Sequence, residues 1–405
     1  MRKIWIAIFI LCAASAVYAA DVKEADLAGL WYPADTEELS GMLTSYIDQA
    51  NPPEVGGDIT ALIVPHAGYR FSGPVAGYGF KAVAGGKYNT VVIVGFSHRK
   101  PYDGISVYGR GVFKTPLGQA GIDEELAGRI IAYHRDISFY PDLFKDENSV
   151  EMIIPFVQLA LKDAKIVPVA FGEQSWERCR IFADALAAAI GGRKDVLVIA
   201  STDMSHYYPY SVANRIDGFT IKRLEKLEPE ELYKEIKLGT CEMCGAAPVV
   251  SVMMAMKKMG AEGIKILKYQ NSGDTTGNRS EVVGYASAAF YKKGARQMAV
   301  EKQKKRLLEI ARHAMEAYIK TGKTLEFKED DPELLKAKGA FVTLHKNGDL
   351  RGCIGNIIGH GPLYKTVRDM AIASSTQDPR FSRVSASELD DIKIEISVLS
   401  QPVQV

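Results

Sequence analysis

The sequence predicts an α/β fold with a central, mainly parallel sheet flanked by helices, followed by a smaller C-terminal α+β domain. Up to about residue 292, short apolar runs of strand length alternate with longer helix-like segments. The runs Ile59 to Val64 and Thr90 to Val94 are apolar at most positions, which indicates strands buried on both faces. With 47% hydrophobic and 24% charged residues, the 405-residue chain has an ordinary globular composition and room for two or more domains.

The first domain is expected to span residues 21–292. Its expected strands are 59–64, 90–94, 165–170, 195–200, 263–269 and 281–291. Its expected helices are 36–48, 78–83, 123–134, 150–162, 176–190, 212–224, 229–237 and 247–259. A hairpin or an irregular insertion is expected between Pro101 and Pro116.

Capping and breaking residues set the ends of several of these helices. Asp35 or Thr36 would cap the first helix. Asn148 and Glu151 have the spacing of a capping box before the helix at 150–162. Pro155 should kink that helix or mark a later start, because proline removes a backbone donor.

The second domain is expected to span residues 293–405, after the boundary Lys292-Lys293-Gly294. It should contain helices at 302–320 and 362–375, a hairpin formed by strands 339–344 and 351–355, and a last strand at 393–399. Gly322 should end the first of these helices. The order of elements therefore changes from an α/β to an α+β pattern.

The first twenty residues have the features of a secretory signal peptide. Arg2 and Lys3 precede the apolar run from Ile4 to Val17, and small residues lead to a cleavage site near Ala19. We therefore expect an exported protein, periplasmic or extracellular, that is not stably inserted in a membrane after cleavage. The alternative is an uncleaved N-terminal anchor, because the apolar run is at the short end of the range for a spanning helix.

Charge and cysteine content exclude some classes of protein. Cleavage would leave 48 of the 50 basic residues against 49 acidic ones, a net charge of −1, so no nucleic-acid partner is indicated. The remaining cysteines, Cys179, Cys241, Cys244 and Cys353, are too few for a disulfide scaffold. Cys241 and Cys244 could form a disulfide outside the cytoplasm, one of them could bind a metal, or both could be inert thiols.

Candidate metal ligands follow three of the predicted strands. His66, His98 and the pair Asp203/His206 each come directly after an apolar run. The carboxyl ends of neighbouring parallel strands meet at one crevice, although any single histidine there could be structural. Two histidines and one anionic ligand are typical of non-haem Fe(II), whereas a thiolate would also favour copper or zinc. The candidates for the anion are Cys244, Cys241 and Asp203.

Four motifs in this order resemble the Memo family over roughly residues 25 to 292. They are Pro65-His66-Ala67-Gly68-Tyr69, Gly95-Phe96-Ser97-His98, Ser201-Thr202-Asp203-Met204-Ser205-His206 and Cys244-Gly245-Ala246-Ala247-Pro248. This family is similar to the class III (LigB-type) extradiol dioxygenases, which implies their fold. The resemblance implies that His66, His98 and Cys244 bind a metal ion, iron or copper, with zinc as the alternative.

The same resemblance implies roles for residues around the metal. Asp203 and His206 would line the same pocket; because they are close in sequence, they could also orient a ligand or act as catalytic acid and base. Further pocket residues are Tyr69, Ser97, Cys241 and Asn148. Asn148 departs from the family pattern Glu-His-Ser-x-Glu, where it replaces a histidine, and an asparagine cannot transfer a proton.

The C-terminal part is similar to the AMMECR-type domain. The matching stretches are Leu350-Arg351-Gly352-Cys353-Ile354-Gly355, Asp378-Pro379-Arg380-Phe381 and Glu395-Ile396-Ser397-Val398-Leu399. From the length of the match, we expect this domain to be incomplete. The resemblance marks Arg351, Gly352, Cys353 and Arg380 as motif residues, although Arg351 and Cys353 would equally suit a turn and a buried small side chain.

Both resemblances together suggest components B and A of the AmmeMemoRadiSam system, and thus a radical-SAM partner. Such a partner belongs in a reducing cytoplasm, which conflicts with the export signal. The leading hypothesis is an extracytoplasmic metal-binding protein with redox or dioxygenase-like activity on an unidentified small molecule. The alternatives are a non-enzymatic module that binds a peptide or another partner in the same crevice, and a zinc-dependent hydrolase in which Asp203 or His206 activates water.

Overall fold

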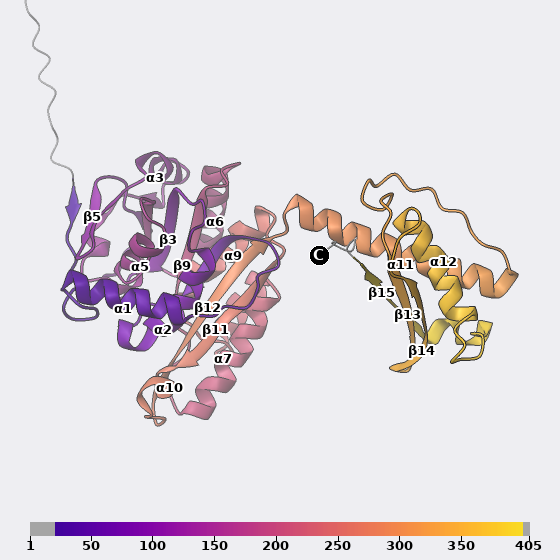
Figure 1. The fold of residues 1–405 in the computed structure, drawn as a ribbon. Coiled ribbons are helices and arrows are strands. Elements are labelled where there is room, and N and C mark those ends of the chain that lie inside the picture. Colours follow the sequence, from indigo (N-terminus) through magenta and orange to yellow (C-terminus); the bar gives the residue numbers. More distant parts are fainter. Residues whose placement is uncertain (1–20, 400–405) are drawn as a thin grey trace, which may run out of the picture. The chain divides into compact units, whose positions relative to one another are not determined.

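The computed structural model describes residues 21–399, which form two compact units that divide between Lys292 and Lys293 (Figure 1). The predicted signal peptide, residues 1–20, lies outside the described residues. Among the described helices, none combines the length and apolar character needed to cross a membrane. Each unit has a hydrophobic core of its own.

A nine-stranded sheet forms the centre of the first unit. Eight strands follow the order β10-β12-β2-β9-β3-β8-β4-β7, and β11 pairs with β12. These strands are β2 (Asp58–Val64), β3 (Thr90–Phe96), β4 (Ile105–Val107), β7 (Ile137–Ser138), β8 (Lys165–Phe171), β9 (Val196–Ser201), β10 (His206–Tyr208), β11 (Gly263–Asn271) and β12 (Val282–Lys292). A separate small sheet is formed by β1 (Val22–Lys23), β5 (Val112–Thr115) and β6 (Gly118–Gly121).

The sheet is mixed, so the prediction of a mainly parallel sheet was wrong. The neighbours β2, β9, β3 and β8 are parallel. On one side of them β12 pairs antiparallel with β2, β11 and β10, and on the other β4 pairs antiparallel with β8. The antiparallel strands were not distinguishable from the parallel ones because both are apolar where they are buried on two faces.

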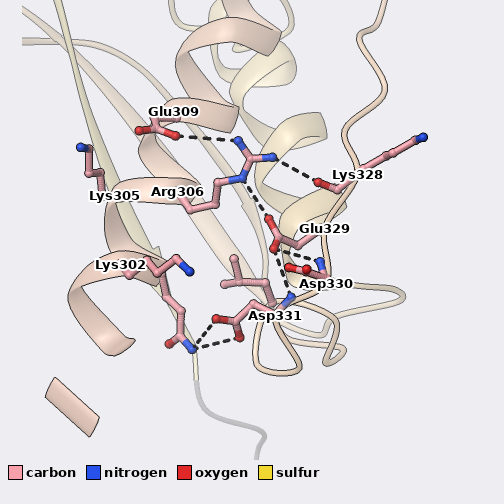
Figure 2. Close-up of a pocket in the computed structure, with 10 residues that line it drawn as sticks. Lys302, Lys305, Arg306, Glu309, Lys328, Glu329, Asp330 and Asp331 are labelled. Atoms are coloured by element: carbon pink, nitrogen blue, oxygen red, sulfur yellow. Dashed lines mark hydrogen bonds and ion pairs between the residues drawn. The ribbon is translucent and has the colours of Figure 1, made fainter. Parts of the chain in front are cut away.

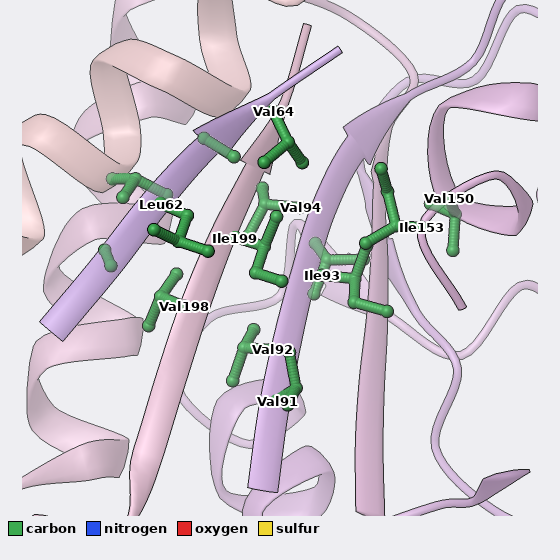
Figure 3. Packing of buried hydrophobic residues seen from close by; sticks show 14 of the residues in the cluster. Leu62, Val64, Val91, Val92, Ile93, Val94, Val150, Ile153, Val198 and Ile199 are labelled. Carbon is green, nitrogen blue, oxygen red and sulfur yellow. The ribbon is translucent and has the colours of Figure 1, made fainter. Parts of the chain in front are cut away.

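The four parallel strands form the centre of the core. Every residue of β3 is buried, which means that both faces of the sheet are covered at this strand. Leu62, Ile199 and Ile93 are direct partners across β2, β9 and β3, and Figure 3 shows them within the apolar cluster. Close packing of such branched side chains fixes the strand positions, and with them the positions of the loops that follow.

Helices flank this sheet. They are α1 (Thr36–Gln49), α2 (Tyr69–Val83), α3 (Glu124–Ile131), α4 (Asn148–Glu151), α5 (Ile154–Ala160), α6 (Trp176–Ile190), α7 (Tyr210–Glu225), α8 (Pro229–Lys237), α9 (Ala246–Lys258) and α10 (Ser272–Thr276), with a 3₁₀ turn η1 (Pro141–Phe144). The carboxylate of Asp35 caps α1 by accepting from the backbone N–H groups of Glu37 and Glu38. Helix α2 packs on α1, β2 and β12, while α9 packs on α6 and β9.

Two helix predictions were wrong in physically informative ways. Helix α2 begins at Tyr69 rather than Tyr78, because the glycines that resemble helix breakers instead permit close packing: a Cβ on Gly77 would lie 2.5 Å from the backbone oxygen of Tyr46. The expected capping box at Asn148 does not form, since Glu147 is the N-cap of α4. A second helix, α5, starts beside Pro155.

The second unit is a small α+β domain. Its three-stranded antiparallel sheet has the order β14-β13-β15, formed by β13 (Ala340–Lys346), β14 (Asp349–Asn356) and β15 (Ile392–Val398). Its helical segments are α11 (Ala295–Thr321), α12 (Leu363–Thr376) and the 3₁₀ helix η2 (Ala386–Asp391). Ile310, Val342 and Val367 belong to its core, where α11 and α12 pack together and α12 also packs on β13.

The contact between α1 and α2 gives a stability prediction. We expect Gly77→Ala to lower the free energy of unfolding by about 1–3 kcal/mol, because the added methyl group has no room beside Tyr46. The matched control is Gly41→Ala in α1, where nothing lies within 4 Å of the added carbon, and alanine should stabilise by about 0.5–1 kcal/mol. Equal effects of the two substitutions would contradict this account.

Tryptophan fluorescence during urea denaturation measures the free energy of unfolding of the first unit, which contains both Gly77 and Gly41. Trp31 and Trp176 are the tryptophans among residues 21–399, and both lie in the first unit. The unfolding transition seen by fluorescence therefore reports on that unit rather than on the C-terminal one.

Candidate metal centre

The candidate ligands follow three neighbouring parallel strands and lie at the same edge of the sheet. His66 follows β2, His98 follows β3, and Asp203 follows β9, which lies between the other two strands in the sheet. Because all three strands run in the same direction, their carboxyl ends lie at the same edge. His206 begins β10, which pairs with β12 at that side of the sheet.

Cys244 reaches the same edge from the loop that precedes α9. The Cys244 N–H donates to the Asp203 carbonyl at 3.2 Å, and the Asp203 N–H donates to the Cys244 sulfur at 3.1 Å. The next residue must be small, because a Cβ on Gly245 would lie 2.5 Å from the Ser201 carbonyl oxygen. Two backbone segments thus meet closely, and the thiol is held against the end of β9.

The gathered side chains form two sets of candidate ligands that share Cys244. Within residues 21–399, the ligand atoms of His66, His98 and Cys244 lie within 4.8 Å of one another, as do those of Asp203, His206 and Cys244. The His66 Nε2 atom is 3.3 Å from the Cys244 sulfur and 4.0 Å from the nearer Asp203 carboxylate oxygen. Two imidazoles, a thiol and a carboxylate are a donor set that suits iron, copper or zinc.

Hydrogen bonds orient both histidines of the first set. The His66 Nδ1 atom is 2.8 Å from the Ser201 hydroxyl oxygen, and the His98 Nδ1 atom is 2.8 Å from Oε1 of Glu147. The two rings are nearly perpendicular, with centroids 5.3 Å apart. His66 is buried, whereas 30% of the His98 side chain is exposed, so the site opens on the His98 side.

Burial sets the protonation of the innermost groups. It lowers the pKa of His66 to about 3, with a further contribution from the neighbouring His98, so the imidazole stays neutral and able to bind a metal. Burial also raises the pKa of Asp203 to about 6. The backbone N–H of His66, which donates to the Asp203 carboxylate, acts in the opposite direction. Burial and the Asp203 charge raise the pKa of the Cys244 thiol well above its usual range.

Glu147 keeps a negative charge beside these groups. Burial raises its pKa, but hydrogen bonds from His98 and from the Ser149 N–H outweigh that effect and leave the pKa lowered. The site therefore contains two carboxyl groups whose pKa values shift in opposite directions: that of Glu147 is lowered, and that of Asp203 is raised to about 6.

Four residues predicted to line the pocket have other contacts. The buried Tyr69 donates its hydroxyl to the Met152 carbonyl at 2.8 Å, and the Cys241 thiol donates to Glu235 at 3.3 Å. The hydroxyl of Ser97 accepts from the Lys100 N–H at 3.0 Å, and the Asn148 amide lies 3.5 Å from the His66 carbonyl. Of the four, Asn148 is the one whose side chain contacts a candidate ligand residue. Cys241 and Cys244 are both free in the structure.

Sequence reasoning missed several residues that support the site. Glu147 and Ser201 hold the two histidines, and Gln174 donates to the Cys244 carbonyl at 2.9 Å while accepting from the Ala247 N–H. The buried Tyr285 lies close enough to Asp203 for that carboxylate to contribute to its raised pKa. Ser201 begins one of the family motifs, and Glu147 is the first residue of the Glu-His-Ser-x-Glu pattern. The spacing of these residues does not predict which histidine either of them contacts.

A strained residue lies beside His206. The pairing of β10 with β12 shifts register between His206 and Tyr208, which leaves Tyr207 as a bulge. Tyr207 has a φ of 62°, in the left-handed region, and its side chain is 71% exposed. Its ring centroid is 5.7 Å from that of His206.

In the C-terminal unit, the motif residues Arg351 and Arg380 form ion pairs. Arg351 donates to both carboxylate oxygens of Glu388 at 3.1 Å, and Arg380 donates to both oxygens of Asp378. Asp378 also accepts from the Cys353 N–H at 2.8 Å. These contacts fix the segments after α12 against β14.

The other two motif residues, Gly352 and Cys353, lie in close contact with their surroundings. Gly352 has no room for a side chain, because a Cβ would collide with the carbonyl of Ser374 in α12. Cys353 is half-buried, and its sulfur is 3.1 Å from the Thr343 hydroxyl.

A cleft of about 390 Å³ in the same unit is lined by charged residues (Figure 2). The basic ones are Lys302, Lys305, Arg306 and Lys328, and the acidic ones are Glu309, Glu329, Asp330 and Asp331. Arg306 is paired with Glu309 and Glu329, and Gln303 donates to Asp331. The lining is balanced in charge and largely bonded to itself, so it defines no class of ligand.

These features define the first unit as a mixed α/β protein with a candidate centre of imidazole, thiol and carboxyl groups at the strand ends. The family model for Memo-like proteins matches residues 23–289, and the AMMECR1 model matches residues 308–405. The chain therefore belongs to the Memo family and carries an AMMECR1 domain.

Relatives of similar length to the first unit support this assignment. A MEMO1 family protein of Caldivirga maquilingensis is 35% identical over 277 residues, which cover 66% of this chain and 98% of that protein. A MEMO1 family protein of Pyrobaculum aerophilum is 35% identical over 282 residues, 67% of this chain and 99% of that protein. The crystal structure of an uncharacterized protein from Pyrococcus horikoshii is 42% identical over 24% of this chain and 50% of its own, but a TM-score of 0.23 adds no support to the fold.

The raised pKa of Asp203 gives a prediction for the metal-free protein. Stability from its neutral carboxyl group is fully present below pH 3.8 and is lost as the pH rises through about 6. The free energy of unfolding of Asp203→Asn minus that of the wild type should therefore increase between pH 4 and 6, by at most about 1.4 kcal/mol per pH unit. Urea denaturation with a chelator present measures it, and a constant or falling difference would show that Asp203 is ionised throughout.

Proposed function

We propose that the first unit binds an iron or copper ion through His66, His98 and Cys244 and carries out redox chemistry, of the dioxygenase-like kind, on a small molecule. The observation that supports this most directly is the convergence of the three ligand atoms within 4.8 Å. The partly exposed His98 adds support, because it leaves one side of the site accessible to a substrate.

Each residue has a defined task in this proposal. His66 is neutral and buried, so its Nε2 atom is available as a ligand without the loss of a proton. Cys244 must lose its thiol proton to act as a thiolate ligand, which ties binding to proton release. Asp203 can accept or donate a proton near neutral pH, and His206 provides a second titratable group beside the shared Cys244. A bound iron or copper ion would supply electron transfer and an open coordination position.

Zinc-dependent hydrolysis is the second candidate, and Asp203 favours it. A cysteine and two histidines also form catalytic zinc sites, where a nearby group takes a proton from water. Asp203, with a pKa of about 6, suits that task. Metal analysis of the purified protein distinguishes the two: iron or copper supports the redox proposal, and zinc alone supports hydrolysis.

Export from the cytoplasm is part of the proposal and rests on Arg2, Lys3 and the apolar run after them. In an exported protein the site would meet metals and oxidants outside the cell membrane rather than a cytoplasmic radical-SAM partner. Mass spectrometry of the secreted protein should find an N-terminus that begins after Ala19, whereas an intact Met1 in the soluble fraction would contradict export.

Removing two ligands tests the metal site directly. We expect the double variant His66→Ala/His98→Ala to bind Fe(II) and Cu(I) more than about 100-fold more weakly than the wild type, because only Cys244 remains of the three proposed ligands. Anaerobic calorimetry measures the affinity, and His134→Ala, which changes a histidine outside both ligand sets, is the matched control. Unchanged binding by the double variant would place the metal elsewhere and refute the proposed ligands.

A further inference from the structure

The two candidate histidine ligands are held by groups of different charge. His66 faces a neutral hydroxyl, that of Ser201, whereas His98 faces a buried carboxylate, that of Glu147. Both Nδ1 atoms are 2.8 Å from the partner oxygen. The two hydrogen bonds therefore differ in the charge of the partner and not in length. A charged partner forms the stronger hydrogen bond and adds a negative charge to the imidazole that it contacts.

The position and hydrogen bonds of Glu147 fix its carboxylate against His98. Its side chain is fully buried at the N-terminus of α4. Oε1 accepts from the Ser149 N–H at 2.8 Å as well as from His98, and Oε2 accepts from the His98 backbone N–H at 2.6 Å. An ionised carboxylate can only accept hydrogen bonds, so the His98 ring must carry its proton on Nδ1, which leaves the Nε2 lone pair of the neutral ring free.

His98 depends on this contact more than His66 depends on Ser201. His66 is held independently, since it is 1% exposed and its backbone N–H donates to Asp203 at 2.9 Å. His98 lies in an exposed loop after β3, and Glu147 binds both its ring and its backbone. Packing thus positions one ligand, and a carboxylate positions the other.

We propose that Glu147 is the positioning residue of the metal centre: it fixes the ring orientation and tautomer of His98 and makes that imidazole the more strongly donating of the two. This inference rests on the proposed metal-binding function. Ser201 orients His66 without adding charge. A bound cation would therefore be stabilised more by Glu147 than by Ser201, and its oxidised form more than its reduced form.

The metal-free protein provides the first test. Nitrogen-15 NMR of the imidazoles should show His98 protonated on Nδ1 in the wild type, and Glu147→Gln should move part of the population to the Nε2 tautomer, because the amide can also donate to Nδ1. A wild-type His98 protonated on Nε2 would overturn the proposal. This measurement needs no metal, and its wild-type half remains decisive if Glu147→Gln does not fold.

Metal binding provides the second test, with Ser201→Ala as the matched control. Anaerobic calorimetry with Cu(I) and Fe(II) should show about 10–100-fold weaker binding by Glu147→Gln and a smaller loss for Ser201→Ala. The reduction potential of the copper-loaded protein should rise in Glu147→Gln and change less in Ser201→Ala. Equal losses in the two variants would refute the special role of Glu147.

The two proposals fail in different ways. If the wild type binds neither metal, the proposed function is wrong whichever tautomer NMR finds. If the wild type binds metal and Glu147→Gln binds it equally well, the metal site stands and the positioning role of Glu147 is refuted. Thermal unfolding of the variants identifies any loss of affinity that comes from unfolding alone.

Discussion

The parallel pairing of β2, β9 and β3 is the constraint on which the candidate site depends. Each strand is held by backbone hydrogen bonds to its neighbour and by apolar side chains that are buried over the length of β3. The pairing register therefore sets where each following loop begins, and it places His66, His98 and Asp203 at one edge of the sheet. A shift in the pairing of β9 would move Asp203, and with it Cys244, which is bonded to the same segment.

Polar groups at this edge are costly to bury, and the structure offsets that cost with specific partners. Glu147 accepts three N–H hydrogen bonds, and Glu151, a few residues later, accepts from the backbone of Asp26 and Leu27 and from the Tyr32 hydroxyl. The bonds to Glu147 favour its charged form and leave its pKa lowered. The hydrogen bonds that Asp203 accepts do not outweigh the effect of its burial, so its pKa is raised. The pKa values of Glu147 and Asp203 thus shift in opposite directions, because their hydrogen bonds differ.

The sequence predicted the strand ends better than it predicted the sheet. Apolar runs followed by histidine or aspartate located the ends of β2, β3 and β9, because burial on both faces leaves a clear local pattern. The strands β2, β11 and β12 were predicted, but the antiparallel pairing of β12 was not, since pairing direction depends on distant segments. The hydrogen bond from the hydroxyl of Tyr69, a predicted pocket residue at the start of α2, to the Met152 carbonyl spans 83 residues and has no local signal in the sequence. The contact of Glu147 with His98 spans 49 residues, and no local pattern encodes it.

The bulge at Tyr207 has a consequence for how the site can open. A tyrosine in the left-handed region is held there at a cost of about 1–2 kcal/mol, which the pairing of β10 with β12 must supply. That pairing is short and ends the sheet, and the Tyr207 ring gains little from burial. His66 is buried at the end of a central strand, so the two sides of the candidate site differ in rigidity. Local unfolding around the candidate site should therefore begin at β10, where strain is released as the backbone hydrogen bonds open.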